Sequence, residues 1–578
     1  MKYIKIIILL FISALFLGAC ESVDLDQTVD PSSANPNLLD PVFAFNYVQI
    51  ELADFVDRTN SFTQRVTRQM AMTGGNTYEN AFAPVNFDGQ WSTGYNIMNA
   101  VKTLEPKARE TNANYILGAS KVVRCYVLMT FVDMYGRIPY SQSLLGVENI
   151  TPAYDDDESV YVGILGELDD AIDLLELESN TGVRTQDLYY GGQSGWIKLA
   201  KTLKLRMYNN CNLLTTVGDK VVADEINALV SENDLIDTPA DDFAFRYGNS
   251  RFNPNSRHPL YNDQYEAGGG SYIANYIMWA MTTEKGNPSN FQNTIGNPGD
   301  PRVNYYFFRQ DPDPSNDDNF TLPGRVQPRP DHYNDPKYRS FYDPSIRACY
   351  TVSNWISGGI ASNGFWGRDH GNNAGIPPDQ DKRTVAGLYP IGGEFGTAAS
   401  VQTNGNKGVL GAGIMPIMLS SWVHFMKAEL MMKGILSGGS AGAQAELSLA
   451  ISQSIQKSTT LFPDYNKGLA PDVLQEKTAD YLSFIEDVFT DTTSQERKLE
   501  LIMKEFYIAT WGNGIEPYNN YRRTGYPSNF QPTLEPEPGL FFNAALYAGS
   551  SVNNNPNVPT NDRTRKVFWA APSVVDLH

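Results

Sequence analysis

The sequence predicts a mostly α-helical protein in which degenerate tetratricopeptide-like helix pairs flank a large irregular insertion. Apolar residues recur at helical spacing in two blocks of the chain, 42–236 and 416–524. Short links between the predicted helices favour antiparallel pairs, although the period of about 34 residues that regular tetratricopeptide repeats show is absent. Residues 237–415, between the blocks, are dense in Gly, Pro, Asn, Asp and aromatic residues instead.

Three helices stand out in the first block. We expect them at 114–134, 159–175 and 196–213, where apolar side chains recur three and four positions apart. Gly136 and Pro139 follow the first of these helices and predict where it ends.

An acidic run, Asp155 to Glu158, immediately precedes the helix predicted at 159–175. Carboxylates in series could ligate calcium, or they could cap the helix and interact favourably with its dipole. We favour capping, because an acidic run at a helix start is more often a solvated helix end than a metal site.

The second block predicts four helices, at 420–436, 443–461, 478–489 and 493–511. Thr493 and Glu496 have the spacing of a capping box, so the last of these helices is expected to begin there. After Gly525 the pattern is lost, and 525–578 is predicted to be an irregular tail.

The insertion at 237–415 is expected to be ordered. Disordered segments are poor in aromatic residues, whereas this region contains Trp279, Trp355 and Trp366. Only 271–283 has a helical pattern. Because long ordered loops usually have a function, we expect the ligand-facing surface in this insertion.

The N-terminal residues predict a membrane anchor. Lys2 and Lys5 accompany an apolar run, Ile6–Leu17, that is too short to span a bilayer. The following residues, Gly18, Ala19 and Cys20, resemble the lipobox of bacterial lipoproteins, in which the cysteine is lipidated. An ordinary secretory signal with an accidental cysteine is the alternative.

Three parts of the chain follow from this interpretation. We expect a lipoprotein signal peptide at 1–19, a lipidated tether at 20–41 and a single domain at 42–578. A covalent lipid on Cys20 would hold the domain on a membrane without spanning it.

The chain is acidic, with a formal net charge of −20 at pH 7. Nucleic-acid binding needs clustered Lys and Arg, so this charge argues against a nucleic-acid partner. The chain has four cysteines at wide spacings, which does not fit a disulfide framework or a zinc site once Cys20 carries a lipid. Cys125 and Cys211 lie in apolar helical patterns and are expected to be small core residues.

Several segments resemble the SusD/RagB family of outer-membrane lipoproteins, in the branch described as SusD-like. The most specific are 504–514 and 516–527, which read KEFYIATWGNG and EPYNNYRRTGYP. Weaker ones are 131–140 (FVDMYGRIPY), 196–206 and 300–302 (DPR), and the lipobox also fits. Together they extend over essentially the whole chain after Cys20.

The resemblance implies a helical binding protein that is not an enzyme. We expect no cofactor besides the covalent lipid on Cys20, and we predict no metal site, although bound calcium stays an open alternative. Members of the family sit as lids on a TonB-dependent, SusC-like transporter of the outer membrane and deliver oligosaccharides, or in some cases peptides, into it. Glu21, Asp24 and Asp26 are similar to the surface-export signals of such lipoproteins and favour a position facing the cell exterior. Arg522 and Arg523 are expected to be structural residues paired with carboxylates such as Glu516 or Glu505.

The ligand-contacting residues are predicted from chemistry, because no family motif matches them one by one. A sugar needs aromatic platforms beside hydrogen-bonding Asn, Asp or Arg side chains. In the family, ligand usually meets loops that correspond here to about 73–91 and 261–370. The residues that we predict to contact ligand are Tyr78, Asn80, Trp355, Trp366, Arg368 and Asp369. The alternative is that Trp355 and Trp366 are buried, which is the interpretation that we favour for Trp91.

Catalytic alternatives have little support. Residues 438–442 (GGSAG) fit the G-x-S-x-G pattern, but a predicted helix, not a strand, precedes them. The five histidines form no metal-binding motif. A surface glycoside hydrolase needs only two suitably placed carboxylates, and 65 acidic residues cannot be sorted by sequence. A scaffold protein built on helical repeats is a third alternative.

Overall fold

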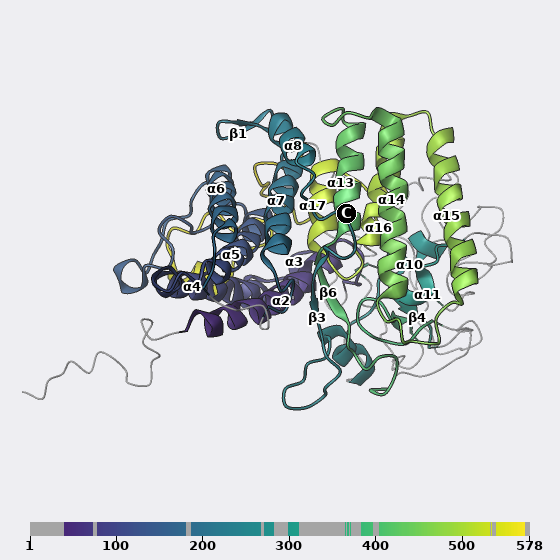
Figure 1. Ribbon diagram of the computed structural model, residues 1–578, viewed down its shortest axis with the longest axis horizontal. Helices are drawn as coiled ribbons and strands as arrows, with labels where there is room; N and C mark the ends of the chain where they lie inside the picture. The colour runs from purple at the N-terminus through teal and green to yellow at the C-terminus, as the bar shows by residue number, and fades with distance from the viewer. Residues whose placement is uncertain are drawn as a thin grey trace, which may run out of the picture.

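The computed structural model describes residues 40–72, 78–180, 187–266, 271–282, 299–310, 365, 367–368, 370–371, 383–396, 404–531, 533 and 539–572. Its helices form two groups, with the first block on one side of the molecule and the second block on the other (Figure 1). The predicted fold class, mostly α-helical with two helical blocks, is confirmed.

The first block is built from antiparallel helices that pack on their sequence neighbours. Its elements are α2 (Pro41–Val66), α3 (Tyr78–Ala81), η2 (Pro84–Phe87), α4 (Asp88–Glu110), α5 (Asn114–Tyr135), η3 (Gly146–Glu148), α6 (Asp157–Glu176), α7 (Gln193–Asn210), β1 (Thr216–Val217), β2 (Lys220–Val221) and α8 (Val222–Ser231). Asp40 begins the first helix by accepting a hydrogen bond from the Val42 amide at 2.9 Å.

Helix α5 is the centre of this block. Among the described residues it is the one helix long and apolar enough to cross a membrane by length and composition, and it is almost wholly buried in the protein. Helices α2, α4, α6 and α7 surround it. It ends at Gly136, which adopts a φ of +71°, as the sequence predicted. Cys125 lies in its interior, buried as expected.

The acids before α6 have structural roles. Asp156 is the N-cap of α6 and accepts a hydrogen bond from the Ser159 amide at 3.4 Å. Asp155 accepts hydrogen bonds from the Tyr140 amide at 2.8 Å, and Asp157 from the Phe568 amide at 2.9 Å. Capping, which the sequence favoured over a calcium site, is therefore what the structure shows for this run.

The second block contains α13 (Ser420–Met432), α14 (Gly439–Thr460), α15 (Pro471–Asp491), α16 (Gln495–Ala509) and α17 (Ile515–Thr524). The cap of α16 differs from the prediction: Ser494, not Thr493, accepts the hydrogen bond from the Arg497 amide, at 3.3 Å. Ser440 lies in the first turn of α14, and the Lys498 ammonium donates to its hydroxyl at 3.0 Å. A turn after α13 leads into it, so the strand that a nucleophile elbow requires is missing at this serine.

Helix α17 joins the two blocks, packing on α2 and α7 as well as on α16. The Asn60 side chain of α2 makes the link explicit. Its Nδ2 donates to the Gly512 carbonyl at 3.0 Å, and its Oδ1 accepts from the Gly514 amide at 2.9 Å. One contiguous hydrophobic core consequently runs from Ala44 in α2 to Trp569 in the tail.

The described parts of the insertion are ordered and pack on the helices, as predicted, but they contain paired strands that were not predicted. Its elements are β3 (Phe243–Arg246), α9 (Pro259–Tyr261), η5 (Asn262–Glu266), α10 (Asn275–Thr282), α11 (Val303–Tyr306), β4 (Phe307–Phe308), β5 (Val385–Ala386) and β6 (Ile414–Met418). Strand β3 pairs antiparallel with β6, and β4 with β5. The tail has one short helix, α18 (Gly549–Asn554).

Buried arginine–carboxylate pairs connect these elements. Arg206 of α7 donates to Asp133 of α5 at 2.9 Å and to Glu516 of α17 at 2.6 Å. Arg302 donates to Glu505 of α16 at 3.0 Å. Each pair is almost completely excluded from solvent, so each charge depends on its partner.

Arg522 and Arg523 are buried, as expected of structural residues, but their predicted carboxylate partners are wrong. Arg523 pairs with Glu429 of α13 at 2.6 Å. The guanidinium of Arg522 lies over the Tyr518 ring, 3.8 Å from its centre. Glu516 pairs instead with Arg206 at 2.6 Å, and Glu505 with Arg302 at 3.0 Å.

Candidate functional site

Three segments that are far apart in the sequence meet beyond the C-terminal end of α2. Met70 forms an antiparallel bridge with Ile273, and Ala274 a parallel bridge with Arg368. The Gly371 amide donates to the Met72 carbonyl at 3.1 Å. We call residues 69–72, 271–275, 367, 368, 370 and 371 the three-segment junction. Residues 271–275, 367 and 368 lie within 261–370, where the sequence predicted ligand contacts, and residues 69–72 directly precede the other predicted region, 73–91.

Backbones approach closely at this junction. The Arg368 amide donates to the Ile273 carbonyl at 3.0 Å. A Cβ added at Gly367 would lie 2.0 Å from the same carbonyl oxygen, which no side chain tolerates. Glycine at 367 is therefore required for the segments to pair.

Buried polar side chains pack beside the junction. Arg68 donates to the Tyr78 hydroxyl at 2.7 Å and to the Gln531 carbonyl at 2.9 Å. The Tyr78 and His370 rings lie with centres 5.8 Å apart. Burial, together with the nearby Arg68 charge, lowers the pKa of His370 well below its ordinary value, so this imidazole is neutral.

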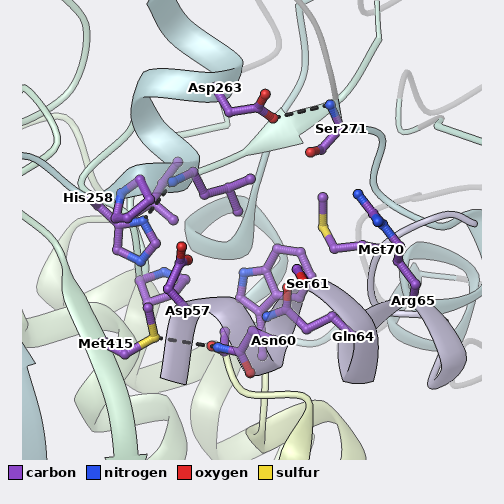
Figure 2. Close-up of a pocket in the computed structure, with 16 residues that line it drawn as sticks. Asp57, Asn60, Ser61, Gln64, Arg65, Met70, His258, Asp263, Ser271 and Met415 are labelled. Atoms are coloured by element: carbon purple, nitrogen blue, oxygen red, sulfur yellow. Dashed lines mark hydrogen bonds between the residues drawn. The ribbon is translucent and has the colours of Figure 1, made fainter. Parts of the chain in front are cut away.

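A cavity of about 190 Å³ lies next to the junction, between one face of α2 and the segment 258–263 together with Ser271. Met70 and Ser271 of the junction form part of its wall (Figure 2). Asp57 and Arg65 of α2 line its floor and occupy opposite ends in the view. The side chains of Asp57 and Arg65 are partly exposed, so a ligand can reach the cavity from solvent.

Asp57 places a carboxylate in this cavity. The side chain is partly buried and has no hydrogen-bond or ion-pair partner among the described residues. Burial, with added repulsion from Asp54 and Asp263 and partial relief from Arg58, raises its pKa to about 6. Asp57 therefore changes charge close to neutral pH.

Arg65 supplies the opposite charge. Burial lowers its pKa, and the field of Asp263 counteracts this only in part. Within the part of the chain that the structure describes, its guanidinium forms no ion pair. Asp263 is engaged elsewhere, since it accepts a hydrogen bond from the Ser271 amide at 3.1 Å (Figure 2).

His258 completes the wall as a neutral group. Its Nδ1 accepts a hydrogen bond from the Leu260 amide at 3.1 Å and caps α9. Burial lowers its pKa to about 3, so it carries no charge at neutral pH. The indole of Trp511, which is 1% exposed, lines the same cavity, and its N–H has no hydrogen-bond partner among the described residues.

Comparison with protein families identifies the chain. Residues 33–346 match the family model described as "Starch-binding associating with outer membrane", and residues 397–547 match the model described as "Susd and RagB outer membrane lipoprotein". The chain belongs to the SusD/RagB family. At the level of this family it is a nutrient-binding outer-membrane lipoprotein, a class of binding proteins rather than of enzymes.

Solved structures of SusD homologues share the fold. A chitin-binding SusD homologue from Flavobacterium johnsoniae is 17% identical with a TM-score of 0.62, covering 92% of this chain and 98% of that one. A SusD homologue from Bacteroides fragilis is 19% identical with a TM-score of 0.59, covering 90% and 98%. A SusD/RagB protein from Bacteroides thetaiotaomicron is 17% identical with a TM-score of 0.61, covering 90% and 98%. No curated protein matches the sequence.

The predicted ligand residues of this SusD/RagB protein lie in different environments. Tyr78 and Arg368 are completely buried, and the Arg368 guanidinium lies 4.9 Å from the centre of the Tyr272 ring. A ligand would reach either side chain only after the residues around it rearranged. Asn80 lies in α3, with its side chain outside what the structure describes.

The other predicted positions, Cys20, Trp355, Trp366 and Asp369, lie outside the described residues, so their roles stay predictions. Trp91 is a core residue, as expected: it is 8% exposed and stacks on Phe131 with ring centres 5.3 Å apart.

The cavity residues Asp57, Arg65 and Asp263 were missed by sequence reasoning. A signal was present, because α2 has polar residues at 57, 60, 61, 64 and 65, which share one face of a helix. Such a stripe usually faces solvent, and nothing in the sequence shows that residues 258–263 and Ser271 line a cavity with it.

Proposed function

We propose that the protein captures glycans at the outer face of the outer membrane and passes them to a TonB-dependent, SusC-like transporter. In this proposal a lipid on Cys20 holds it at the membrane. The observation that carries the proposal is the convergence of three distant segments at one junction beside an open, charged cavity. Loops presented on a rigid helical scaffold are a common way to build a binding surface.

A glycan is the ligand that we favour, with a peptide as the alternative. The family description names starch binding, and one structural neighbour is described as a chitin-binding homologue. Trp355 and Trp366, in the insertion that leads into the junction, remain the predicted stacking platforms. Alanine at either position is expected to weaken glycan binding by about fivefold, since an aromatic stacking contact contributes about 1 kcal/mol.

Titration calorimetry with a panel of soluble oligosaccharides measures this effect. Trp91→Phe is a suitable control, because Trp91 is a core residue whose ring stacks inside the protein. If both alanine variants bind every glycan as tightly as the wild-type protein, the stacking platforms lie elsewhere.

Partner and anchor are tested together by purification from native outer membranes. The wild-type protein should co-purify with a TonB-dependent barrel, and Cys20→Ser should appear in the soluble fraction. A wild-type protein that is recovered from membranes without any barrel would contradict hand-off to a transporter. A Cys20→Ser protein that stays membrane-bound would contradict lipidation at Cys20.

Hydrolysis is a second candidate function, because the cavity holds two carboxylates. A glycosidase needs an acid with a raised pKa beside an ionised carboxylate. Burial raises the pKa of Asp57 to about 6, and Asp263 provides a second carboxylate in the lining of the same cavity. Incubation of the purified protein with the oligosaccharide panel decides between the two: release of shorter sugars that Asp57→Asn abolishes would establish an enzyme, and unchanged sugars would leave binding as the function.

A further inference from the structure

The cavity between α2, residues 258–263 and Ser271 contains polar groups without partners among the described residues. The Trp511 N–H is buried and unpaired, although more than nine in ten buried polar groups in native proteins are paired. The Asp57 carboxylate and the Arg65 guanidinium are only partly buried, and neither forms a hydrogen bond or ion pair with a described residue. The cavity therefore offers an entering ligand two charges that no described residue neutralises by direct contact.

Asp57 and Arg65 cannot complete each other. They are eight residues apart on α2, which corresponds to about 12 Å along the helix axis. In Figure 2 they stand at the two ends of the cavity. A volume of about 190 Å³ is smaller than the roughly 300 Å³ from which drug-sized pockets begin, so the cavity accommodates one chemical unit rather than a whole oligosaccharide.

Charge indicates which unit fits. Asp57 and Asp263 both face the cavity, so the Asp57 end repels anions and stabilises a cation. An ammonium group placed there would pair with Asp57, as a charge-assisted hydrogen bond requires. The net charge of −20 would also concentrate cationic ligands near the protein. Arg65 and the Trp511 N–H, which only donate hydrogen bonds, need oxygen acceptors from the same unit.

We infer that this cavity binds a sugar unit that carries a free amine, with the ammonium on Asp57 and the ring or hydroxyl oxygens toward Arg65 and Trp511. The inference rests on the proposed function, since it names the glycan class that the binding protein selects. Such a cavity would distinguish amino sugars from their N-acetylated and neutral counterparts, which bring no positive charge to Asp57.

The groups around Asp57 define its pH response. Asp54 and Arg58 are its neighbours on α2, and Asp263 and His258 face it from the segment that covers the cavity. Burial, with smaller contributions from Asp57 and Asp54, raises the pKa of the Tyr247 hydroxyl well above its ordinary value, so this group stays protonated near neutral pH. Because His258 is neutral, Asp57 is the cavity group that changes charge near pH 6. Binding of an ammonium should therefore strengthen as pH rises from 5 to 7.

The test is titration calorimetry with three oligosaccharides of equal length: a glucosamine oligomer, an N-acetylglucosamine oligomer and a glucose oligomer. Wild-type protein should bind the glucosamine oligomer at least about tenfold more tightly than the other two at pH 7. Asp57→Asn should remove this preference and its dependence on pH. Asp54→Asn, which deletes the same charge from α2 outside the cavity lining, should preserve the preference.

The outcomes separate the two levels of the proposal. Equal affinity for the three oligomers, or a preference that survives in Asp57→Asn, overturns the amine site and leaves glycan capture standing. Failure of all three oligomers to bind to a folded protein overturns the amine site, and failure of the wider oligosaccharide panel as well overturns glycan capture. Circular dichroism of each variant establishes that it is folded.

Discussion

Replacing Arg523 with methionine should destabilise the protein severely, because it leaves a buried carboxylate without its main partner. Arg523 donates to both oxygens of Glu429, at 3.0 and 2.6 Å, and both side chains are 0% exposed. Burial alone would raise the pKa of Glu429, but Arg523 and Lys433 outweigh it and hold that pKa well below its ordinary value. The carboxylate is thus charged in the native state and depends on these two cations.

Breaking a buried pair by removing one partner destabilises a protein by about 3–5 kcal/mol. Lys433, at 2.9 Å from Glu429, remains in Arg523→Met and favours the lower end of that range. The free energy of unfolding from urea titrations, followed by circular dichroism, measures the loss. Glu429→Met combined with Arg523→Met should recover part of it, since no unpaired carboxylate is then left in the core.

The pH dependence gives an independent check. A carboxylate with a lowered native pKa contributes stability that is present above its unfolded pKa and disappears as pH falls. Arg523→Met should therefore weaken the acid sensitivity that Glu429 causes. Lys467→Met is the control, because Lys467 is 60% exposed and lies 3.4 Å from Glu394, a pair worth at most about 1 kcal/mol. A loss in Arg523→Met no larger than in this control would refute the reasoning.

Three further predictions concern the site. Gly367→Ala should lower the melting temperature, because its Cβ would lie 2.0 Å from a backbone carbonyl oxygen. Gly166→Ala is the control: this position of α6 is exposed and open, so alanine should stabilise the helix by about 0.5–1 kcal/mol. Thermal unfolding of both variants measures the two effects. The native pKa of Asp57, about 6, lies above its ordinary value of 3.8, so the protein loses stability as pH rises between these values. Asp57→Asn should therefore be more stable than the wild-type protein above pH 6 and equally stable below pH 4. Urea titrations at a series of pH values measure this difference. The native pKa of His258, about 3, lies below its ordinary value of 6.5, so the protein loses stability as pH falls between these values. The stability of His258→Gln should decline less over this pH range. An unchanged dependence of stability on acid pH would contradict the assignment of His258 as a buried neutral group.

The helical blocks could be predicted because their signals are local. Helix α5 is apolar along its length and is followed by Gly136, and its observed bounds, Asn114–Tyr135, match the prediction closely. Helix α16 was predicted with its cap one residue early, since Thr493 and Ser494 are both good N-caps and only the fold selects between them. Strands β3 and β6 were missed because the partners are about 170 residues apart, and short apolar runs do not distinguish strands from helices.

The predicted ligand contacts stay predictions, but the structure shows where two of the predicted residues lie. The sequence indicated the regions around Tyr78 and Arg368, and these do meet at the three-segment junction. It could not show that both side chains are buried there, because burial depends on Tyr272, Phe541 and other distant residues that pack on them. Asp57 was missed for the same reason, since a polar residue on a helix becomes a cavity residue only when another segment covers it.

The link between Asn60 and residues 512–514 has a consequence for how the chain matures. These residues are separated by some 450 positions, yet their two hydrogen bonds close the core between α2 and α17. A polypeptide that emerges with its N-terminus leading delivers α2 long before α17. During that interval α4 and α5 can pack on α2, but the part of its surface that receives α17 stays uncovered, so the two blocks close on each other only when the last helices arrive.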